Sequence, residues 1–474
     1  MFSRILDPRA EVVLRDDLIT PMHHHTPGKD FLVAQTADGP RRVSVNEATR
    51  IVAAADSTPG VHDVDRVDGS RFSRRNFLRS GTIGAGALAV SAMTPRMSFA
   101  AGAQDLLVVC FLRGGIDGLS AIVPVTDSAY YNARPNIAVR PEETFALNAN
   151  FGMNRNMDAL KPLWDARQLA VVLGSGNPSI TRSHFEDQTA CEQAAPAAQR
   201  SGWIGRHLAS SSSAAGTFRA IAMGERVAIS LTTTAFETVA MSSVSEFDIY
   251  AWEGIKTPLL RSLDEMYAHA GGIARDQAHL TISAINSLAE VRNTPYTPQN
   301  GAEYPDHSFA RGLKDIARMA KANVGLEAAT VDFSDWDMHY GLGVASNPND
   351  WFARNSRLLA QGLAAFARDL GSKWGTTTVV LMSEFGRRVE QNGDWGADHG
   401  HGNVLWALGG GIAGGVYGSQ PSLSDGNLIM GDVPLTTDYR LPLAEIVTKR
   451  LGNGSSLGQV FPGYTPGAFL GVAR

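Results

Sequence analysis

The sequence predicts an α/β protein with a mostly parallel, doubly wound sheet flanked by helices, and three observations support this class. Several short, continuous apolar runs are bounded by glycine, as in strands that are buried on both faces. Helical patterns separate these runs, and alternating strands and helices are typical of parallel sheets. The chain has 474 residues, 44% of them hydrophobic, which provides a large core and excludes a disordered protein.

The elements follow in order along the chain. Apolar runs predict strands at residues 106–112, 169–173 and 377–382, and a weaker one at 404–408. Periodic patterns predict helices at residues 157–165, 258–269, 276–291, 307–323 and 350–370. Between residues 225 and 325 the only strand pattern is at 227–232, so we expect a largely helical insertion there. The whole of 101–474 is then a single α/β domain.

Composition narrows the class of protein further. The formal net charge is −5, which does not favour a nucleic-acid-binding protein with a clustered basic face. Two cysteines exclude a disulfide-stapled scaffold, although a bond between Cys110 and Cys191 stays open. After residue 100 no apolar run reaches the ~18 residues of a membrane span. We therefore expect a protein without a stable membrane span.

Residues 73–100 have the order of features of an export signal. The pair Arg74-Arg75 is followed by Phe-Leu, a Gly- and Ala-rich apolar run and the small-residue site 98–100. This segment resembles a twin-arginine signal, which implies export machinery as a partner and a periplasmic or secreted location. The alternative is a glycine-rich amphipathic helix of a cytoplasmic protein. The polar residues 1–72 are expected to form a disordered extension.

Histidines and acids cluster in the segments that follow the predicted strands, where open α/β sheets bind ligands. Asp337 and His339 are two residues apart, as are His399 and His401, so on an extended segment each pair points the same way. With Asp117, Glu384 and Asp398 they form a nitrogen-and-oxygen set, which favours zinc, manganese, magnesium or calcium. Each motif alone could equally be structural, which leaves a protein without any cofactor as the alternative.

A second group of residues, which are candidates for catalysis, lies at the predicted start of a helix near residue 184. Ser183 at a helix start could act as a nucleophile, with His184 as a base and Arg182 as an anion clamp. The alternative is a capping box formed by Ser183 and Glu186. The two roles are compatible.

Several of these segments together resemble the bacterial domain of unknown function family 1501. The resemblance covers about residues 105–470 and rests on FLRGGIDGL from Phe111, SHF at 183–185, GWIGR at 202–206, Asp337-Met338-His339, SEFGR at 383–387 and DHG at 398–400. Members of this family commonly carry twin-arginine signals.

The chain is also distantly similar to the alkaline phosphatase and sulfatase superfamily, whose fold is of the predicted type. That similarity implies Asp117 as the first metal-binding aspartate, Ser183 as the nucleophile and Asp337 with His339 as the middle pair. His399 or His401 would be the late histidine. Glu384-Phe385 stands where the superfamily has Asp-His, and Asp337 and His339 are closer in sequence than the superfamily's pair.

The resemblance implies a metal-dependent hydrolase that acts on a phosphate or sulfate ester, with a small anionic ester or an envelope component as its partner. Because phenylalanine cannot bind a metal, Phe385 implies one metal or none in place of two. The alternative is a non-catalytic periplasmic binding or envelope-associated protein, which keeps the fold with a degenerate metal site.

Overall fold

The computed structural model describes residues 31–36, 39–44, 105–211, 218–236 and 238–474, and the chain divides into two compact units, 1–94 and 95–474. In the first unit β1 (Phe31–Thr36) pairs antiparallel with β2 (Gly39–Ser44), with Phe31 opposite Ser44. This hairpin lies inside the extension 1–72, for which the sequence predicted disorder. The predicted export signal at 73–100 lies outside the described residues.

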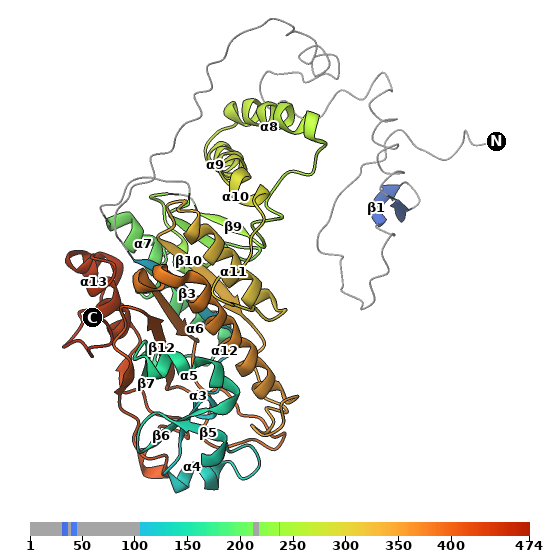
Figure 1. Ribbon diagram of the computed structural model, residues 1–474. Coiled ribbons are helices and arrows are strands. Elements are labelled where there is room, and N and C mark those ends of the chain that lie inside the picture. Colours follow the sequence, from blue (N-terminus) through green and yellow to red (C-terminus); the bar gives the residue numbers. More distant parts are fainter. Residues whose placement is uncertain (1–30, 37–38, 45–104, 212–217, 237) are drawn as a thin grey trace, which may run out of the picture. The chain divides into compact units, whose positions relative to one another are not determined.

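The second unit is built on one nine-stranded sheet (Figure 1). Eight strands follow the order β13-β7-β12-β11-β3-β10-β8-β9, and β14 pairs with the end of β7. Every pair is parallel except those of β12, which runs antiparallel to β7 and to β11. The strands are β3 (Leu106–Leu112), β7 (Leu169–Gly176), β8 (Ala220–Met223), β9 (Val239–Met241), β10 (Ala328–Phe333), β11 (Thr377–Met382), β12 (Asn403–Gly409), β13 (Gly415–Gly418) and β14 (Thr437–Asp438).

Successive side chains of the central strand β3 point to opposite faces of the sheet, which explains why helices cover both faces. All seven residues of LLVVCFL are buried. Leu106, Val108, Cys110 and Leu112 pack into one core with α11 (Ser308–Lys321) and α12 (Trp351–Leu370). Leu107, Val109 and Phe111 pack into another with α6 (His184–Gln193), α7 (Trp203–Ser210), α13 (Arg440–Lys449) and α14 (Leu457–Val460). The predicted α/β class with a mostly parallel sheet is confirmed.

The boundaries of the central elements agree with those predicted from the sequence, whereas the strands at one edge of the sheet were not predicted. The run 377–382 is β11, and the helical pattern 350–370 is α12, which ends before Gly371 in a backbone conformation with φ 55°. The predicted strand at 227–232 is wrong, because its middle is a short 3-10 helix at Ile229–Leu231. The edge strands β8 and β9 were not predicted, since they have only four and three residues.

The remaining elements lie around the sheet. In the stretch 225–325 the helix α8 (Glu253–Ala268) packs on α9 (Ile273–Ser287), α9 contacts the edge strand β9, α10 (Ala289–Asn293) follows α9, and α11 packs against β10 (Figure 1). A small antiparallel sheet has the order β4-β6-β5. Its strands and the short helices near it are β4 (Ile122–Pro124), β5 (Thr144–Ala146), β6 (Phe151–Asn154), α3 (Gly118–Ala121), α4 (Ser128–Ala133) and α5 (Lys161–Asp165).

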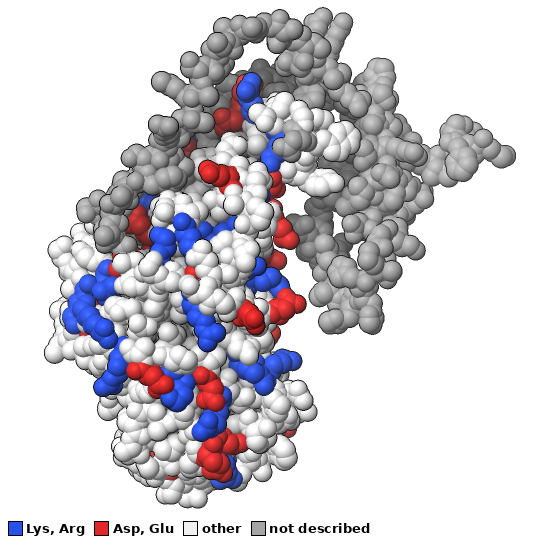
Figure 2. Space-filling model, in the orientation of Figure 1, with Lys and Arg blue, Asp and Glu red and all other residues white. Residues whose placement is uncertain are grey.

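Three further properties concern membrane spans, the cysteines and the surface charge. Across the described residues, no helix has both the length and the apolar character needed to cross a membrane. Cys110 and Cys191 are both buried free thiols, so the disulfide that the sequence left open is not formed. Figure 2 shows basic and acidic side chains intermixed on the face in view, without a broad patch of one sign.

Candidate metal centre

The site lies at the edge of the sheet where the parallel strands end. After β3 comes Gly114, after β10 come Asp337 and His339, and after β11 comes Glu384. Asp398 and His399 precede β12, and because this strand is antiparallel, its beginning meets the ends of its neighbours. His184 reaches the same edge as the first residue of α6. The topology therefore brings five distant segments together, as expected for a ligand site in an open α/β sheet.

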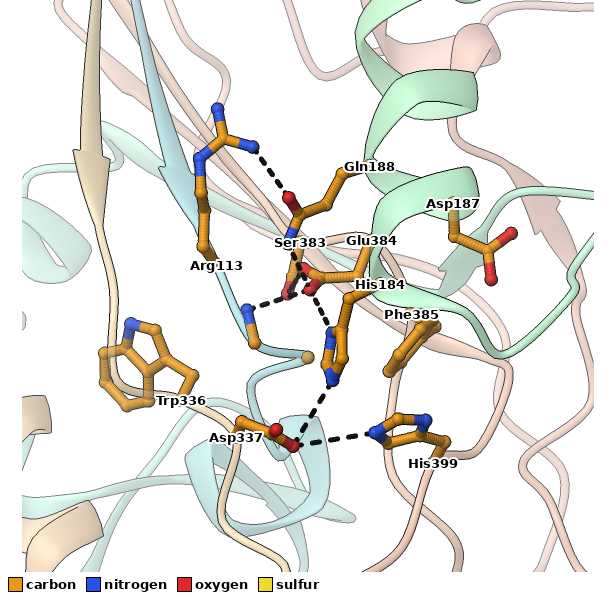
Figure 3. Close-up of polar contacts among 12 residues, drawn as sticks. Arg113, His184, Asp187, Gln188, Trp336, Asp337, Ser383, Glu384, Phe385 and His399 are labelled. Carbon is orange, nitrogen blue, oxygen red and sulfur yellow. Dashed lines mark hydrogen bonds and ion pairs between the residues drawn. The ribbon is translucent and has the colours of Figure 1, made fainter. Parts of the chain in front are cut away.

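Three imidazole nitrogens converge on one carboxylate oxygen. Asp337 Oδ1 lies 3.3 Å from His184 Nε2, 3.2 Å from His339 Nε2 and 3.5 Å from His399 Nε2. The Nε2 atoms of His339 and His399 are only 2.8 Å apart. Figure 3 shows His184 and His399 on two sides of Asp337, with their rings turned toward it. These four side chains are called the histidine cluster below.

The opposite nitrogen of each ring is held by a hydrogen-bond acceptor. His184 Nδ1 lies 2.7 Å from Glu384 Oε1, and His339 Nδ1 lies 2.8 Å from Asp398 Oδ1. His399 Nδ1 lies 2.8 Å from the backbone carbonyl of Arg182, which can only accept. These partners place the hydrogen on Nδ1 and leave the Nε2 lone pairs free to point at the cluster. Such partners orient metal-binding histidines in proteins.

This arrangement fits a divalent cation. Two Nε2 lone pairs 2.8 Å apart repel each other unless a proton or a metal ion lies between them. His184 Nε2 is buried and has no hydrogen-bond partner among the described residues. His184, Asp337 and His399 by themselves place one ligand atom each within 4.8 Å of one another. Three nitrogens and one carboxylate oxygen suit zinc and similar transition metals better than magnesium or calcium, which take mostly oxygen.

The charges around the cluster favour a cation as well. The hydrogen bond to Glu384 raises the pKa of His184 above its usual value, although burial opposes this. Burial would raise the pKa of Glu384, but hydrogen bonds from His184, Gln188 and the Gly114 amide outweigh it and lower that pKa. Burial likewise opposes the lowered pKa of Asp337, which is caused mainly by Arg387. Both carboxyl groups are therefore held as carboxylates next to the imidazoles.

Arg387 is a buried residue that joins the loops of the site, and no role was predicted for it from the sequence. Its side chain is 1% exposed and donates to the carbonyls of Gly114, Gly115, Trp336 and Ala397. Its Nη2 also donates to Asp337 Oδ1 at 2.7 Å. Three of the loops that carry or support the cluster are thus tied to one guanidinium. The only signal for this role was its place in SEFGR, directly after a buried strand.

The structure brings together only some of the predicted metal ligands. Asp337, His339 and His399 belong to the histidine cluster, and His184, which the sequence offered as a base, joins them. Glu384 and Asp398 hold histidine Nδ1 atoms and do not point at the common centre. His401 Nε2 bonds to the Asn177 carbonyl at 2.9 Å, outside the cluster.

Asp117 is placed differently from the prediction, because it forms a buried ion pair with Arg134. Asp117 is 2% exposed, and both of its carboxylate oxygens accept from the Arg134 guanidinium. The Ser120 hydroxyl also donates to it, at 2.6 Å. Its oxygens are therefore committed to holding the loop after β3, and the structure does not offer them to a metal.

The structure also gives the three predicted catalytic residues other roles. Ser183 Oγ accepts from the Glu186 amide as the cap of α6, which agrees with the capping alternative. The Arg182 guanidinium forms an ion pair with the buried Asp432, so it does not act as a free anion clamp. His184 Nδ1 is held by Glu384, and its Nε2 faces Asp337 inside the cluster. His184 is therefore unsuited to the predicted role of base.

Phe385 supports the histidines. It is 1% exposed, and its ring lies 4.9 Å from that of His184 and 4.7 Å from that of His399, measured between centroids. Gly115 packs so closely on this ring, at φ 64°, that an added Cβ would lie 2.7 Å from it. The aromatic side chain thus fixes two imidazoles in place. Its presence in SEFGR does not imply that the metal site has been lost.

Comparisons with known proteins agree with the family resemblance. The family model described as "Protein of unknown function (DUF1501)" matches residues 166–430. No curated protein sequence matches the chain. Similar solved structures include a 2-O GAG sulfatase, at 11% identity with 65% of each chain covered and a TM-score of 0.29.

Two other similar structures have comparable scores. A sulfatase from Pseudoalteromonas sp. is 9% identical, with 66% of this chain and 64% of that chain covered and a TM-score of 0.29. The phosphonate monoester hydrolase of Agrobacterium radiobacter is 10% identical, with 77% and 78% covered and a TM-score of 0.29. The chain thus spans about 65% of the length of the first two of these structures.

Proposed function

The chain belongs to the DUF1501 family of proteins of unknown function, and we propose that it is a metal-dependent hydrolase of phosphate or sulfate esters. The observation that carries this proposal is the convergence of three Nε2 atoms on Asp337, each from a ring whose Nδ1 is already held. The residues that would hold the metal are His184, Asp337, His339 and His399.

The protein side chains have separate tasks in this proposal. A divalent ion would act as a Lewis acid toward an ester oxygen. Arg387 keeps Asp337 in place and ionised, while Glu384, Asp398 and the Arg182 carbonyl orient the three rings. Ser183, next to His184 at the start of α6, is the proposed nucleophile: its Oγ bonds to phosphorus or sulfur as the ester bond to the alcohol oxygen breaks, and the hydroxyl proton leaves with the alcohol. Water then cleaves the enzyme ester and frees the serine.

Metal content and ester turnover measured on the same variants test this proposal. We expect His399→Ala to lose the bound metal and turnover of 4-nitrophenyl phosphate or sulfate by at least about a hundredfold, since a ligand is removed. His401→Ala is the matched control, because His401 lies two residues on and bonds to Asn177 instead. It is expected to keep both properties. Elemental analysis and initial rates are the measurements.

A third variant separates the two roles of Ser183. Asparagine caps helices as well as serine does, so Ser183→Asn keeps the cap and removes the nucleophile. We expect it to bind metal normally and to lose turnover. Full turnover in Ser183→Asn would contradict the nucleophile, and normal metal content in His399→Ala would contradict the centre. Metal binding without turnover of any ester in the native protein would favour the non-catalytic binding protein.

We also propose that the protein is exported by the twin-arginine pathway to the periplasm or beyond. The support is the sequence of residues 73–100, with its arginine pair, apolar run and small-residue site. Replacing Arg74 and Arg75 together by lysine is expected to retain the protein in the cytoplasm, because the pathway reads the arginine pair. Cell fractionation measures this. Unchanged export of the double variant would contradict the proposal.

A further inference from the structure

Three exposed aromatic side chains lie in the segments that form the histidine cluster. Phe185 is 86% exposed and follows His184, Tyr340 is 73% exposed and follows His339, and Trp395 is 57% exposed and lies three residues before Asp398. Ile429 and Met430, at 50% and 76%, are in the loop that ends at Asp432, the partner of Arg182. Exposed aromatic groups gathered in this way mark binding surfaces.

The backbone presents two of these rings in fixed positions. The Gly341 amide donates to the Asp394 carbonyl and the Leu342 amide to the Trp395 carbonyl, each at 3.0 Å. The segments that carry Tyr340 and Trp395 are therefore paired side by side. Trp395 itself has φ 58°, a left-handed conformation that costs energy for a bulky residue. Such strain is kept only where the surrounding structure determines it, as at ligand sites.

The three rings have no aromatic partner of their own. Among the described residues, no ring of Phe185, Tyr340 or Trp395 stacks on another ring or on a cation. Next to two of these rings are exposed carboxylates, Glu186 and Asp394. A lipid or a strongly apolar peptide would have to bury these charges, which is costly. The cluster itself is open, since the side chains of Asp337 and His339 are 48% and 42% exposed.

A large polar cavity opens at the carboxyl end of β10, close in sequence to the cluster. Its volume is about 1290 Å³, more than a single drug-sized ligand needs. Ser334, three residues before Asp337, lines it together with other hydroxyl groups, among them Ser242, Ser245 and Ser308. Acidic and basic side chains, such as Glu225 and Arg226, occur on the same wall. A lining of hydroxyl groups and charged groups of both signs offers many hydrogen-bond partners to a polyhydroxylated ligand.

We propose that the alcohol part of the ester is a carbohydrate, whose ring faces stack on Phe185, Tyr340 and Trp395 while neighbouring sugar units reach the polar cavity. This inference rests on the proposed ester hydrolysis for its anionic group only. Sugar rings combine apolar C–H faces with hydroxyl edges, so they match aromatic rings flanked by carboxylates. The exposed carboxylates repel further anions, which selects a neutral saccharide carrying a single ester group.

The test measures binding of unesterified oligosaccharides, because they contain no ester to hydrolyse. Isothermal titration calorimetry of the metal-loaded full chain would use neutral oligosaccharides of glucose and of galactose, with dodecyl sulfate as the apolar comparison. We expect saturable binding of at least one oligosaccharide. Trp395→Ala and Tyr340→Ala should each weaken it about tenfold, since an aromatic contact is typically worth about that factor.

Matched controls come from the same chain. Trp252 and Tyr250 are 79% and 101% exposed near the start of α8, so Trp252→Ala and Tyr250→Ala remove the same side chains elsewhere and should leave binding unchanged. Trp395→Phe keeps a ring and should recover most of the affinity, which separates stacking from misfolding. Equal effects of Trp395→Ala and Trp252→Ala would overturn the proposal.

The outcomes also separate this inference from the proposed function. Oligosaccharide binding without any ester turnover would support the carbohydrate site and contradict the hydrolase. Turnover of 4-nitrophenyl esters without binding of any oligosaccharide would support the hydrolase and contradict the carbohydrate site. Binding of dodecyl sulfate alone, weakened by Trp395→Ala, would overturn the carbohydrate in favour of an apolar alcohol.

Discussion

Arg134→Met is expected to destabilise the protein by about 3–5 kcal/mol, because it leaves a buried carboxylate without its partner. Arg134 is fully buried and makes two bonds to Asp117 and one each to the carbonyls of Arg388 and Val389, both at 2.8 Å. The substitution keeps the apolar volume of the side chain and removes every one of these donors. Urea unfolding followed by circular dichroism is the measurement.

A second substitution shows that the cost comes from the unpaired charge. In the double variant Arg134→Met, Asp117→Asn the buried carboxylate is gone, so part of the lost stability should return. The single variant Asp117→Asn should bind metal in normal amount, because Asp117 is committed to Arg134 and not to the histidine cluster. A loss of metal in Asp117→Asn, with stability unchanged, would restore Asp117 as a ligand and contradict the structure.

The sequence could predict the sheet centre because burial on both faces leaves a continuous apolar run. The run TTVVLM is β11 with the same bounds, and LLVVCFL is β3. The edge strands β8 and β9 leave no comparable pattern, since AIAM and VAM are too short for any period to show. The 3-10 helix at Ile229–Leu231 was mistaken for a strand because apolar residues alone do not distinguish the two.

The candidate site shows a different limit. Acids and histidines that follow predicted strands could be predicted as site residues, and His339 and His399 do meet at one edge of the sheet. Whether an acid faces the common centre or holds an imidazole Nδ1 depends on its partners across the fold. Glu384 and Asp398 therefore could not be told from ligands, and Asp117 could not be assigned to Arg134. Arg387 was missed because a buried arginine and a surface arginine look the same in a sequence.

This role of Arg387 leads to the second large effect. Arg387→Lys is expected to cost about 3 kcal/mol or more, since lysine keeps the charge but cannot reach four carbonyls and a carboxylate in the geometry of a guanidinium. The carbonyls of Gly114, Gly115, Trp336 and Ala397 would lose a buried donor. Because the loops carrying Asp337 and supporting the rings would loosen together, bound metal should also fall. Thermal unfolding and elemental analysis measure the two effects.

Arg388→Lys is the natural control, because the adjacent side chain is 40% exposed and, among the described residues, forms a long ion pair with Asp432 and a bond to the Met430 carbonyl. The buried Asp432 keeps its closer pair with Arg182 and lysine keeps the charge at position 388, so this variant should unfold and bind metal much as the native protein does. Equal losses in Arg387→Lys and Arg388→Lys would mean that positive charge alone matters at this edge. A loss confined to Arg387→Lys would show that its fixed donors hold the loops around the metal centre.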